Sequence, residues 1–207
     1  MNDERANGMS ESYLLDTNAY FNFLKYATQT PSHADIIDET NIFAEAIGKI
    51  KKGKNYISTL SEIEIISVIG KYARGNCGGI QKCNCVISET GERCSHYRYT
   101  NNQKRWNNKT IKWWLKLVNE TIQGASPVLS VSVLPLTGGE VIEAQRIILH
   151  ALTQNFRSLD ALIAATAKEF GKNDGADNIT IITSDKGLKA CLDKCSLPHW
   201  DAFKNTK

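Results

Sequence analysis

Four carboxylates stand where apolar runs give way to turns or to the first turns of helices. Asp16 and Asp185 each end an apolar run, and Glu64 and Asp160 lie early in two segments with helical periodicity. Strand C-termini and helix N-termini converge on one edge of a parallel α/β sheet, so the four side chains are expected to meet there. At about 4–5 Å and an effective dielectric near 20, each close pair costs about 3–4 kcal/mol. A hard divalent cation offsets this repulsion, which predicts a Mg²⁺ or Mn²⁺ site.

Each carboxylate also has a purely structural explanation. Asp16 could cap a helix, Asp160 could interact favourably with the dipole of its helix, and Asp185 could begin a turn. Glu64 stands three residues after Ser61, which is the spacing of a capping box. For any one of these residues both explanations stay open, and it is their joint position at one edge that favours the cation site.

The strands and helices that position these residues can be predicted from the apolar patterns along the chain. Short buried strands are expected at residues 13–15, 56–58, 128–136 and 179–183. Helices are expected after Asp16 and at residues 36–52, 59–72, 111–122, 139–153, 158–170 and 186–194. Strands that alternate with helices predict an α/β fold, with a parallel sheet covered by helices on both faces.

The length and the charge distribution indicate one domain with an insertion. The chain has 207 residues, of which 42% are hydrophobic. We expect residues 1–12 to be disordered and residues 13–203 to form a domain that a Cys-rich basic insertion interrupts at 74–107. Residues 71–116 contain ten Lys/Arg and two Asp/Glu, a net charge of +8 in a chain whose total is +3. A basic surface beside an acidic site fits a polyanion that is cleaved with metal ions.

The sequence has no membrane or secretion signal of the usual kind. No apolar run approaches the length of about 18 residues that a spanning helix needs. The first twelve residues are polar and lack the apolar core of a signal peptide. We therefore expect a cytoplasmic protein that does not bind membranes.

Cysteines are concentrated in the insertion. Cys77, Cys83, Cys85 and Cys94 fall within eighteen residues, and His96 follows. Thiolates favour tetrahedral Zn²⁺, and a segment this poor in apolar residues has few other means of folding. We predict a structural zinc site with these four cysteines as ligands and His96 as a substitute for one of them. Free thiols or a redox pair in a loop remain the alternative.

The two remaining cysteines and the basic residues lead to separate predictions. Cys191 and Cys195 share a helical face with leucines and are expected in the core. The insertion and the next helix mix cations with aromatic residues, which together can neutralise phosphates and stack on unpaired bases. RNA contacts are predicted for Arg98, Lys104, Arg105 and Trp106. A solvated basic surface, with Trp114 in the core, is the alternative.

Four short stretches, each with one of the acids, resemble a known family. They are YLLDTN at residues 13–18, ISTLSEIEI at 57–65, DALIAATA at 160–167 and ITSDK at 182–186. Together they resemble the PIN-domain nucleases, above all the VapC-like ribonuclease toxins of bacterial toxin–antitoxin pairs. The resemblance spans residues 12–203, skips the insertion, and selects Glu64 over Glu62 as the second acid.

This resemblance implies a fold, an activity and a site. The fold would be a PIN-like α/β/α sandwich with a central parallel sheet of four to five strands. The activity would be hydrolysis of RNA phosphodiester bonds by an endoribonuclease that leaves a 5′-phosphate and a 3′-hydroxyl. The residues that bind one or two Mg²⁺ or Mn²⁺ ions and carry out catalysis would be Asp16, Glu64, Asp160 and Asp185. Asn18 and Thr183 would orient these carboxylates, or serve only in a turn or a cap.

The resemblance also implies partners and leaves two rival functions. A VapC-like toxin would be held inactive by an antitoxin protein near the acidic cleft and would form a homodimer. One rival is a non-catalytic RNA-binding module that uses the zinc insertion. The other is a structure-specific DNA nuclease, which the compact size makes the less favoured of the two.

Overall fold

The computed structural model describes residues 11–28, 46–75, 80–82, 91, 97–99, 105–174 and 179–202. The chain divides into two compact units. One unit comprises Met1–Ile63 together with Glu120–Lys207, and the other comprises Glu64–Asn119.

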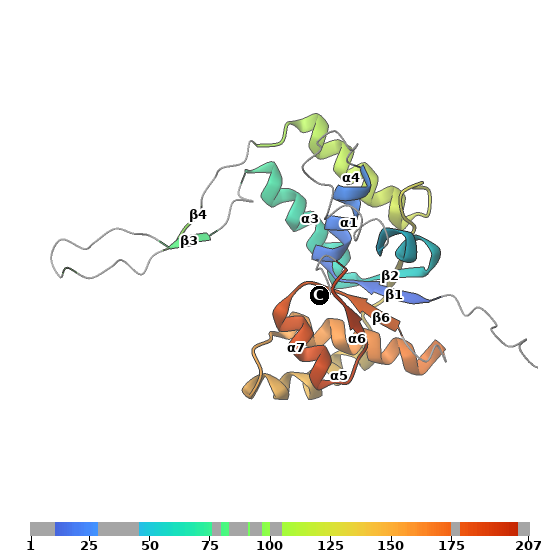
Figure 1. The fold of residues 1–207 in the computed structure, drawn as a ribbon, viewed down its shortest axis with the longest axis vertical. Coiled ribbons are helices and arrows are strands. Elements are labelled where there is room, and N and C mark those ends of the chain that lie inside the picture. Colours follow the sequence, from blue (N-terminus) through green and yellow to red (C-terminus); the bar gives the residue numbers. More distant parts are fainter. Residues whose placement is uncertain are drawn as a thin grey trace, which may run out of the picture. The chain divides into compact units, whose positions relative to one another are not determined.

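A five-stranded sheet forms the centre of the first unit (Figure 1). Its strands are β1 (Ser12–Leu15), β2 (Lys54–Ser58), β5 (Ser132–Leu134), β6 (Ile179–Ile182) and β7 (His199–Trp200). They lie in the order β5-β2-β1-β6-β7, and every neighbouring pair is parallel. The expected α/β class with a central parallel sheet of four to five strands is therefore confirmed.

The central strands are buried on both faces. Leu14, Leu15, Ile181 and Ile182 are exposed by 1% or less. A parallel sheet needs helices on both faces because its strands are joined by crossover connections, and so its central strands are continuously apolar. This is why β1 and β6 are evident in the sequence as uninterrupted apolar runs.

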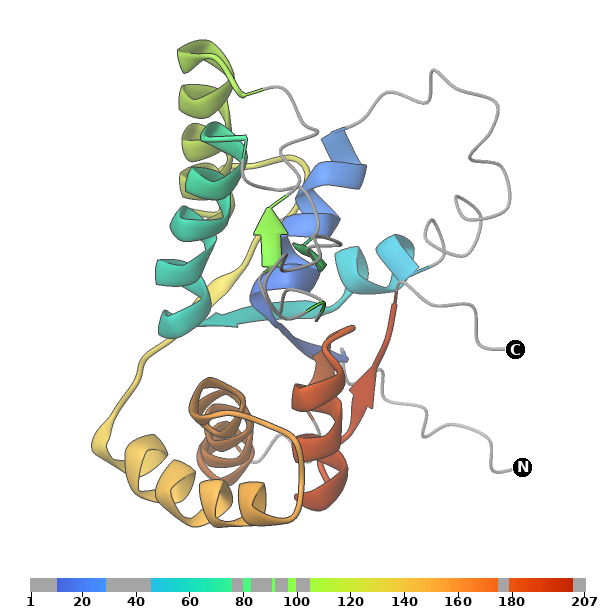
Figure 2. The ribbon, with the colours of Figure 1, turned by 90° about the vertical axis from the view of Figure 1, so that its left-hand side faces the viewer.

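Helices of the first unit cover the two faces of this sheet. The helix α1 (Thr17–Thr28) lies on one face, and α5 (Gly138–Ile147), α6 (Ser158–Asp174) and α7 (Lys186–Lys194) lie on the other (Figures 1 and 2). The alanine-rich face of α6 packs with Leu188 and Leu192 of α7 and with Leu14 of β1 in one hydrophobic core. Residues 46–52 are also helical.

Several expected boundaries differ from the observed ones. Ser12, assigned to a disordered N-terminus, is buried and begins β1. The strand expected at 128–136 is only β5, which ends before Pro135, a residue without an N–H for the ladder. The helix expected at 139–153 is α5 followed by a 3₁₀ helix at Ile148–Leu152. Of the helix expected at 36–52, residues 36–45 lie outside the described residues.

The second unit is larger than the expected insertion at 74–107. It takes in most of α3 (Thr59–Ala73) and of α4 (Asn108–Ile122), with a short antiparallel pair, β3 (Ile80–Lys82) and β4 (Tyr97–Tyr99). This pair was not predicted, because three-residue strands give too little alternation to recognise. The boundaries of this unit therefore fall within α3 and α4.

No helix in the described parts of the chain is long and apolar enough to cross a membrane.

Candidate active site at the carboxyl edge of the sheet

The carboxyl ends of three neighbouring strands carry polar side chains to one edge of the sheet. Leu15 of β1 pairs with Ile182 of β6, and Ile182 pairs with Trp200 of β7. Hydrogen bonds continue one residue beyond these pairs: the Asp16 N–H donates to the Ile182 carbonyl at 3.1 Å, and the Thr183 N–H donates to the Trp200 carbonyl at 3.1 Å. The register therefore brings the residues that follow the strands side by side.

Asp16 follows β1 and is only 3% exposed. Its Oδ1 accepts the Ala19 N–H at 2.5 Å, so Asp16 caps the N-terminus of α1. Its Oδ2 accepts the hydroxyl of Thr183. Oδ1 of Asp16 is therefore used in the helix cap, as one explanation predicted. Oδ2 is held by Thr183, which follows the neighbouring strand.

Thr183 links two of the predicted acids. It is fully buried, and its hydroxyl oxygen accepts the Asp185 N–H at 3.0 Å while the hydroxyl donates to Asp16. This contact is the geometry expected of a residue that orients a carboxylate. Asn18, for which the same role was predicted, is exposed in the first turn of α1.

Asp160 and Asp185 stand at the N-termini of two helices. Asp185 caps α7, since its Oδ1 accepts the Leu188 N–H at 2.9 Å. Asp160 lies in the first turn of α6, where its Oδ2 accepts the Arg157 N–H at 2.8 Å. The positive ends of both helix dipoles favour negative charge at these positions.

These two carboxylates lie on either side of Gly187. A Cβ atom added there would lie 3.1 Å from Oδ1 of Asp185, 3.3 Å from Oδ2 of Asp160 and 3.1 Å from the Asn155 carbonyl oxygen. Because both carboxylate oxygens lie within 3.3 Å of this one point, the two carboxylates are close to each other. A side chain at position 187 would therefore occupy the space between three oxygens. Oxygens of this kind are the ligands that a hard cation favours.

The donor set fits a weakly held hard cation. No group of three or more His, Cys, Asp and Glu side chains among the described residues could hold a metal ion together. Mg²⁺, however, is commonly bound through one or two carboxylates and keeps several waters. Asp160 and Asp185 supply such a pair, with an oxygen-lined space between them, and Asp16 is connected to Asp185 through Thr183.

Asp201 is a further acid at this edge that the sequence did not reveal. It follows β7, accepts the Ser184 hydroxyl at 2.6 Å and forms an ion pair with Lys189 at 2.8 Å. Its position depends on a strand of two residues, which produces no recognisable pattern. The only signal is that Asp201, like Asp16 and Asp185, follows a strand.

Glu64, the remaining predicted acid, belongs to the second unit. It is exposed in the second turn of α3. Ser58 accepts the Ser61 N–H at 3.0 Å, so Ser58 caps this helix and the proposed Ser61–Glu64 capping box is wrong. The role of Glu64 beside the three aspartates stays a prediction.

The predicted zinc ligands fall outside the described part of the chain. This holds for Cys77, Cys83, Cys85, Cys94 and His96. Cys191 and Cys195 lie in or against the hydrophobic core, as expected, and burial raises the pKa of the Cys191 thiol to about 12. A thiol of this kind is inert at neutral pH.

The predicted RNA-contacting residues are only partly described. Lys104 and the side chain of Arg98 fall outside the described residues, and Arg105 is exposed. The Trp106 ring lies 5.1 Å from the ring of Tyr72 and 5.4 Å from that of Trp114, stacked against both. Trp106 is therefore part of a packed aromatic cluster.

The sequence matches no protein-family model and no curated protein. Among solved structures, the fold is similar to the crystal structure of FitAcB from Neisseria gonorrhoeae, with a TM-score of 0.49 and 14% sequence identity. The similarity covers 92% of this chain and 98% of that chain. At this level of similarity we draw no conclusion about function from that structure.

Proposed function

We propose that the chain is a metal-dependent endoribonuclease that hydrolyses RNA phosphodiester bonds at the carboxyl edge of the sheet. The observation that carries this proposal is the close approach of Asp160 and Asp185 around Gly187, with Asp16 connected to Asp185 through Thr183. Two carboxylates that approach this closely repel each other unless a cation is bound between them.

Each residue has a defined part in this proposal. Asp160 and Asp185 would hold Mg²⁺ or Mn²⁺, with Glu64 and Asp16 as further oxygen donors. A bound Mg²⁺ or Mn²⁺ supplies an activated water and offsets the charge of the phosphate. The Thr183 hydroxyl fixes the direction of the Asp16 carboxylate, and the backbone N–H groups of α1 and α7 fix one oxygen each of Asp16 and Asp185.

The biological role rests on the sequence resemblance. We propose that the enzyme is the toxin of a toxin–antitoxin pair, acts in the cytoplasm, forms a homodimer and is inhibited by an antitoxin protein. We also propose that Cys77, Cys83, Cys85 and Cys94 hold a structural Zn²⁺.

Cleavage of a labelled RNA at increasing Mg²⁺ or Mn²⁺ concentration tests the activity. Wild-type protein is expected to cut only when the metal is present, and Asp185→Asn is expected to cut at least a hundredfold more slowly. Asparagine caps helices as well as aspartate does, so this variant removes the charge and keeps the cap on α7.

Asp193→Asn is the matched control, because Asp193 is on the same helix and its side chain is 70% exposed. It should cut at the wild-type rate. RNA that is bound without being cut at any metal concentration would favour the non-catalytic RNA-binding module instead. Cleavage that persists in EDTA would exclude the metal-dependent reaction.

A further inference from the structure

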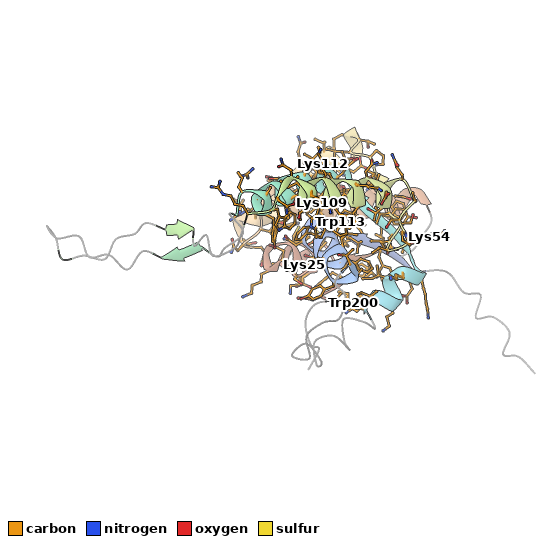
Figure 3. All side chains as sticks on the ribbon, turned by 90° about the horizontal axis from the view of Figure 1, so that it is seen from above. Lys25, Lys54, Lys109, Lys112, Trp113 and Trp200 are labelled. Carbon is orange, nitrogen blue, oxygen red and sulfur yellow. The ribbon has the colours of Figure 1, made fainter. Side chains whose placement is uncertain are left out.

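The N-terminal half of α4 exposes a basic and aromatic surface. Lys109, Lys112 and Trp113 are all exposed, and Trp113 is 46% exposed although tryptophan has a large apolar ring. Their spacing of three and four residues puts them on one side of the helix (Figure 3). We call these three residues the α4 surface.

This surface is unfavourable for the isolated helix. The first twelve residues of α4, from Asn108 to Asn119, contain three lysines and no acidic residue. Lys109 and Lys112 are like charges three residues apart, which destabilises a helix. They also lie in its first two turns, where the helix dipole favours anions over cations. A bound polyanion would remove both penalties.

Trp113 is held in position by its neighbour. Its ring lies 5.3 Å from the ring of Trp114 at an interplanar angle of 83°, and Trp114 is buried and stacked on Trp106. A ring fixed in this way loses little conformational freedom when it meets a ligand. The described rings of Trp106 and Trp114 are engaged in packing, so Trp113 is the tryptophan of this cluster that offers an exposed surface.

We propose that the α4 surface binds single-stranded RNA, with Trp113 stacking on a base while Lys109 and Lys112 neutralise neighbouring phosphates. An aromatic ring between cations is the combination with which proteins bind unpaired nucleic acid without reading its sequence. An acidic protein segment would satisfy the lysines but would not make use of the aromatic ring. The identification of RNA as the ligand rests on the proposed ribonuclease function.

Binding can be measured separately from cleavage. Fluorescence anisotropy of a labelled oligouridine of twelve nucleotides, in EDTA, gives the affinity of the full chain for unpaired RNA at several salt concentrations. Trp113→Ala is expected to bind about tenfold more weakly or worse, and Trp113→Phe is expected to retain most of the affinity. Lys109→Gln with Lys112→Gln should reduce the slope of log affinity against log salt by about 1.4, since each single-strand phosphate contact contributes about 0.7.

Matched controls lie in the other unit. Tyr26→Ala removes an aromatic residue that is 38% exposed, and Lys51→Gln with Lys52→Gln removes two exposed charges. Both controls should bind like wild type. A thermal melt of each variant checks folding. If Trp113→Ala is unfolded, Trp113→Leu takes its place, because leucine keeps an apolar side chain without an aromatic face; it is expected to bind about tenfold more weakly than wild type.

The outcomes separate this inference from the proposed function. Equal affinity of Trp113→Ala and Tyr26→Ala, in folded proteins, would overturn the stacking role. A reduced salt slope without any effect of Trp113→Ala would indicate only a charged surface and would overturn it as well. Tight binding that depends on Trp113 in a protein that never cuts RNA would support this inference and reject the nuclease.

Discussion

Thr183 is the residue on which the geometry of the acidic edge depends most. It is fully buried, donates to one aspartate and accepts from the backbone of another. A single side chain thus fixes the relative positions of Asp16 and Asp185, which are far apart in the sequence. Sequence reasoning predicted that Thr183 orients a carboxylate, but it could not specify which one.

Replacing Thr183 with Val is expected to lower the free energy of unfolding by about 2 kcal/mol. The valine keeps the shape of the side chain but removes a hydrogen bond to a buried charged group and an acceptor for the Asp185 N–H. Urea unfolding measures the change, and RNA cleavage should be lost in parallel. Thr183→Ser keeps the hydroxyl and should retain most of both properties; equal stability of the Val variant and wild type would contradict the role of Thr183.

Gly187→Ala tests the space between Asp160 and Asp185. The added methyl group would approach three oxygens at 3.1 to 3.3 Å, closer than most such contacts. Alanine has the higher helix propensity by about 1 kcal/mol, so the net change in stability should be within about 1 kcal/mol. Cleavage should nevertheless fall at least tenfold, because the methyl group occupies the proposed cation space. A cleavage assay and a thermal melt check this, and unchanged cleavage would argue against a cation there.

Two contacts hold the helix α1 in place: its N-terminal cap at Asp16 and a side-chain hydrogen bond one turn later. The hydroxyl of Tyr20 bonds to that of Thr121 near the end of α4, and both side chains are fully buried. Burial raises the pKa of Tyr20 to about 12, because ionisation would leave a charge in the core.

This raised pKa predicts how stability changes at high pH. The tyrosine pKa is about 10 in the unfolded chain. Its contribution to stability is therefore fully present below pH 10 and is lost as the pH rises toward 12. Between pH 9 and pH 11 the free energy of unfolding of wild type should fall by about 1 kcal/mol more than that of Tyr20→Phe. Urea unfolding at the two pH values measures the difference, and identical pH dependence of the two proteins would contradict the assignment.

The elements that the sequence predicted best are those whose pattern is local. Strands β1 and β6 are continuous apolar runs, and α7 was predicted with its observed bounds because its apolar face is regular and Asp185 marks a turn before it. β7 was missed because two residues carry no periodicity, and Asp201 was missed with it. Trp114 is buried, which the sequence offered only as the alternative to an RNA-contacting surface. Trp106, which was predicted to contact RNA, stacks on the rings of Tyr72 and Trp114.

At the scale of the whole molecule, charge is divided between the two compact units. Residues 64–119 contain ten Lys/Arg and three Asp/Glu, a net charge of +7, whereas the rest of the chain contains 15 and 19, a net charge of −4. The unit boundaries could not be predicted from the sequence, because they depend on how α3 and α4 pack. A chain that combines a basic unit with a sheet edge rich in acidic side chains has a charge distribution suited to a polyanionic ligand.

The proposed zinc site would stabilise the basic unit as a whole. Purified protein is expected to contain about one zinc ion per chain, measured by mass spectrometry of the elements. Cys83→Ser with Cys85→Ser should remove most of it and lower the melting temperature, because bound zinc stabilises only the folded unit. Cys195→Ser, outside the cluster, should retain the zinc. A zinc-free wild-type protein with unchanged stability would contradict the site.

A cation site shared by Asp160 and Asp185 can be tested by calorimetric titration of Mn²⁺ into the wild-type protein and into Asp160→Asn and Asp185→Asn. Both variants keep a side-chain acceptor at their helix N-termini, so only the charge changes. Wild-type protein is expected to bind Mn²⁺ weakly but saturably, each variant is expected to bind it at least tenfold more weakly, and Asp193→Asn should bind it like wild type. Equal Mn²⁺ affinity in all four proteins would contradict a shared cation site at the carboxyl edge of the sheet.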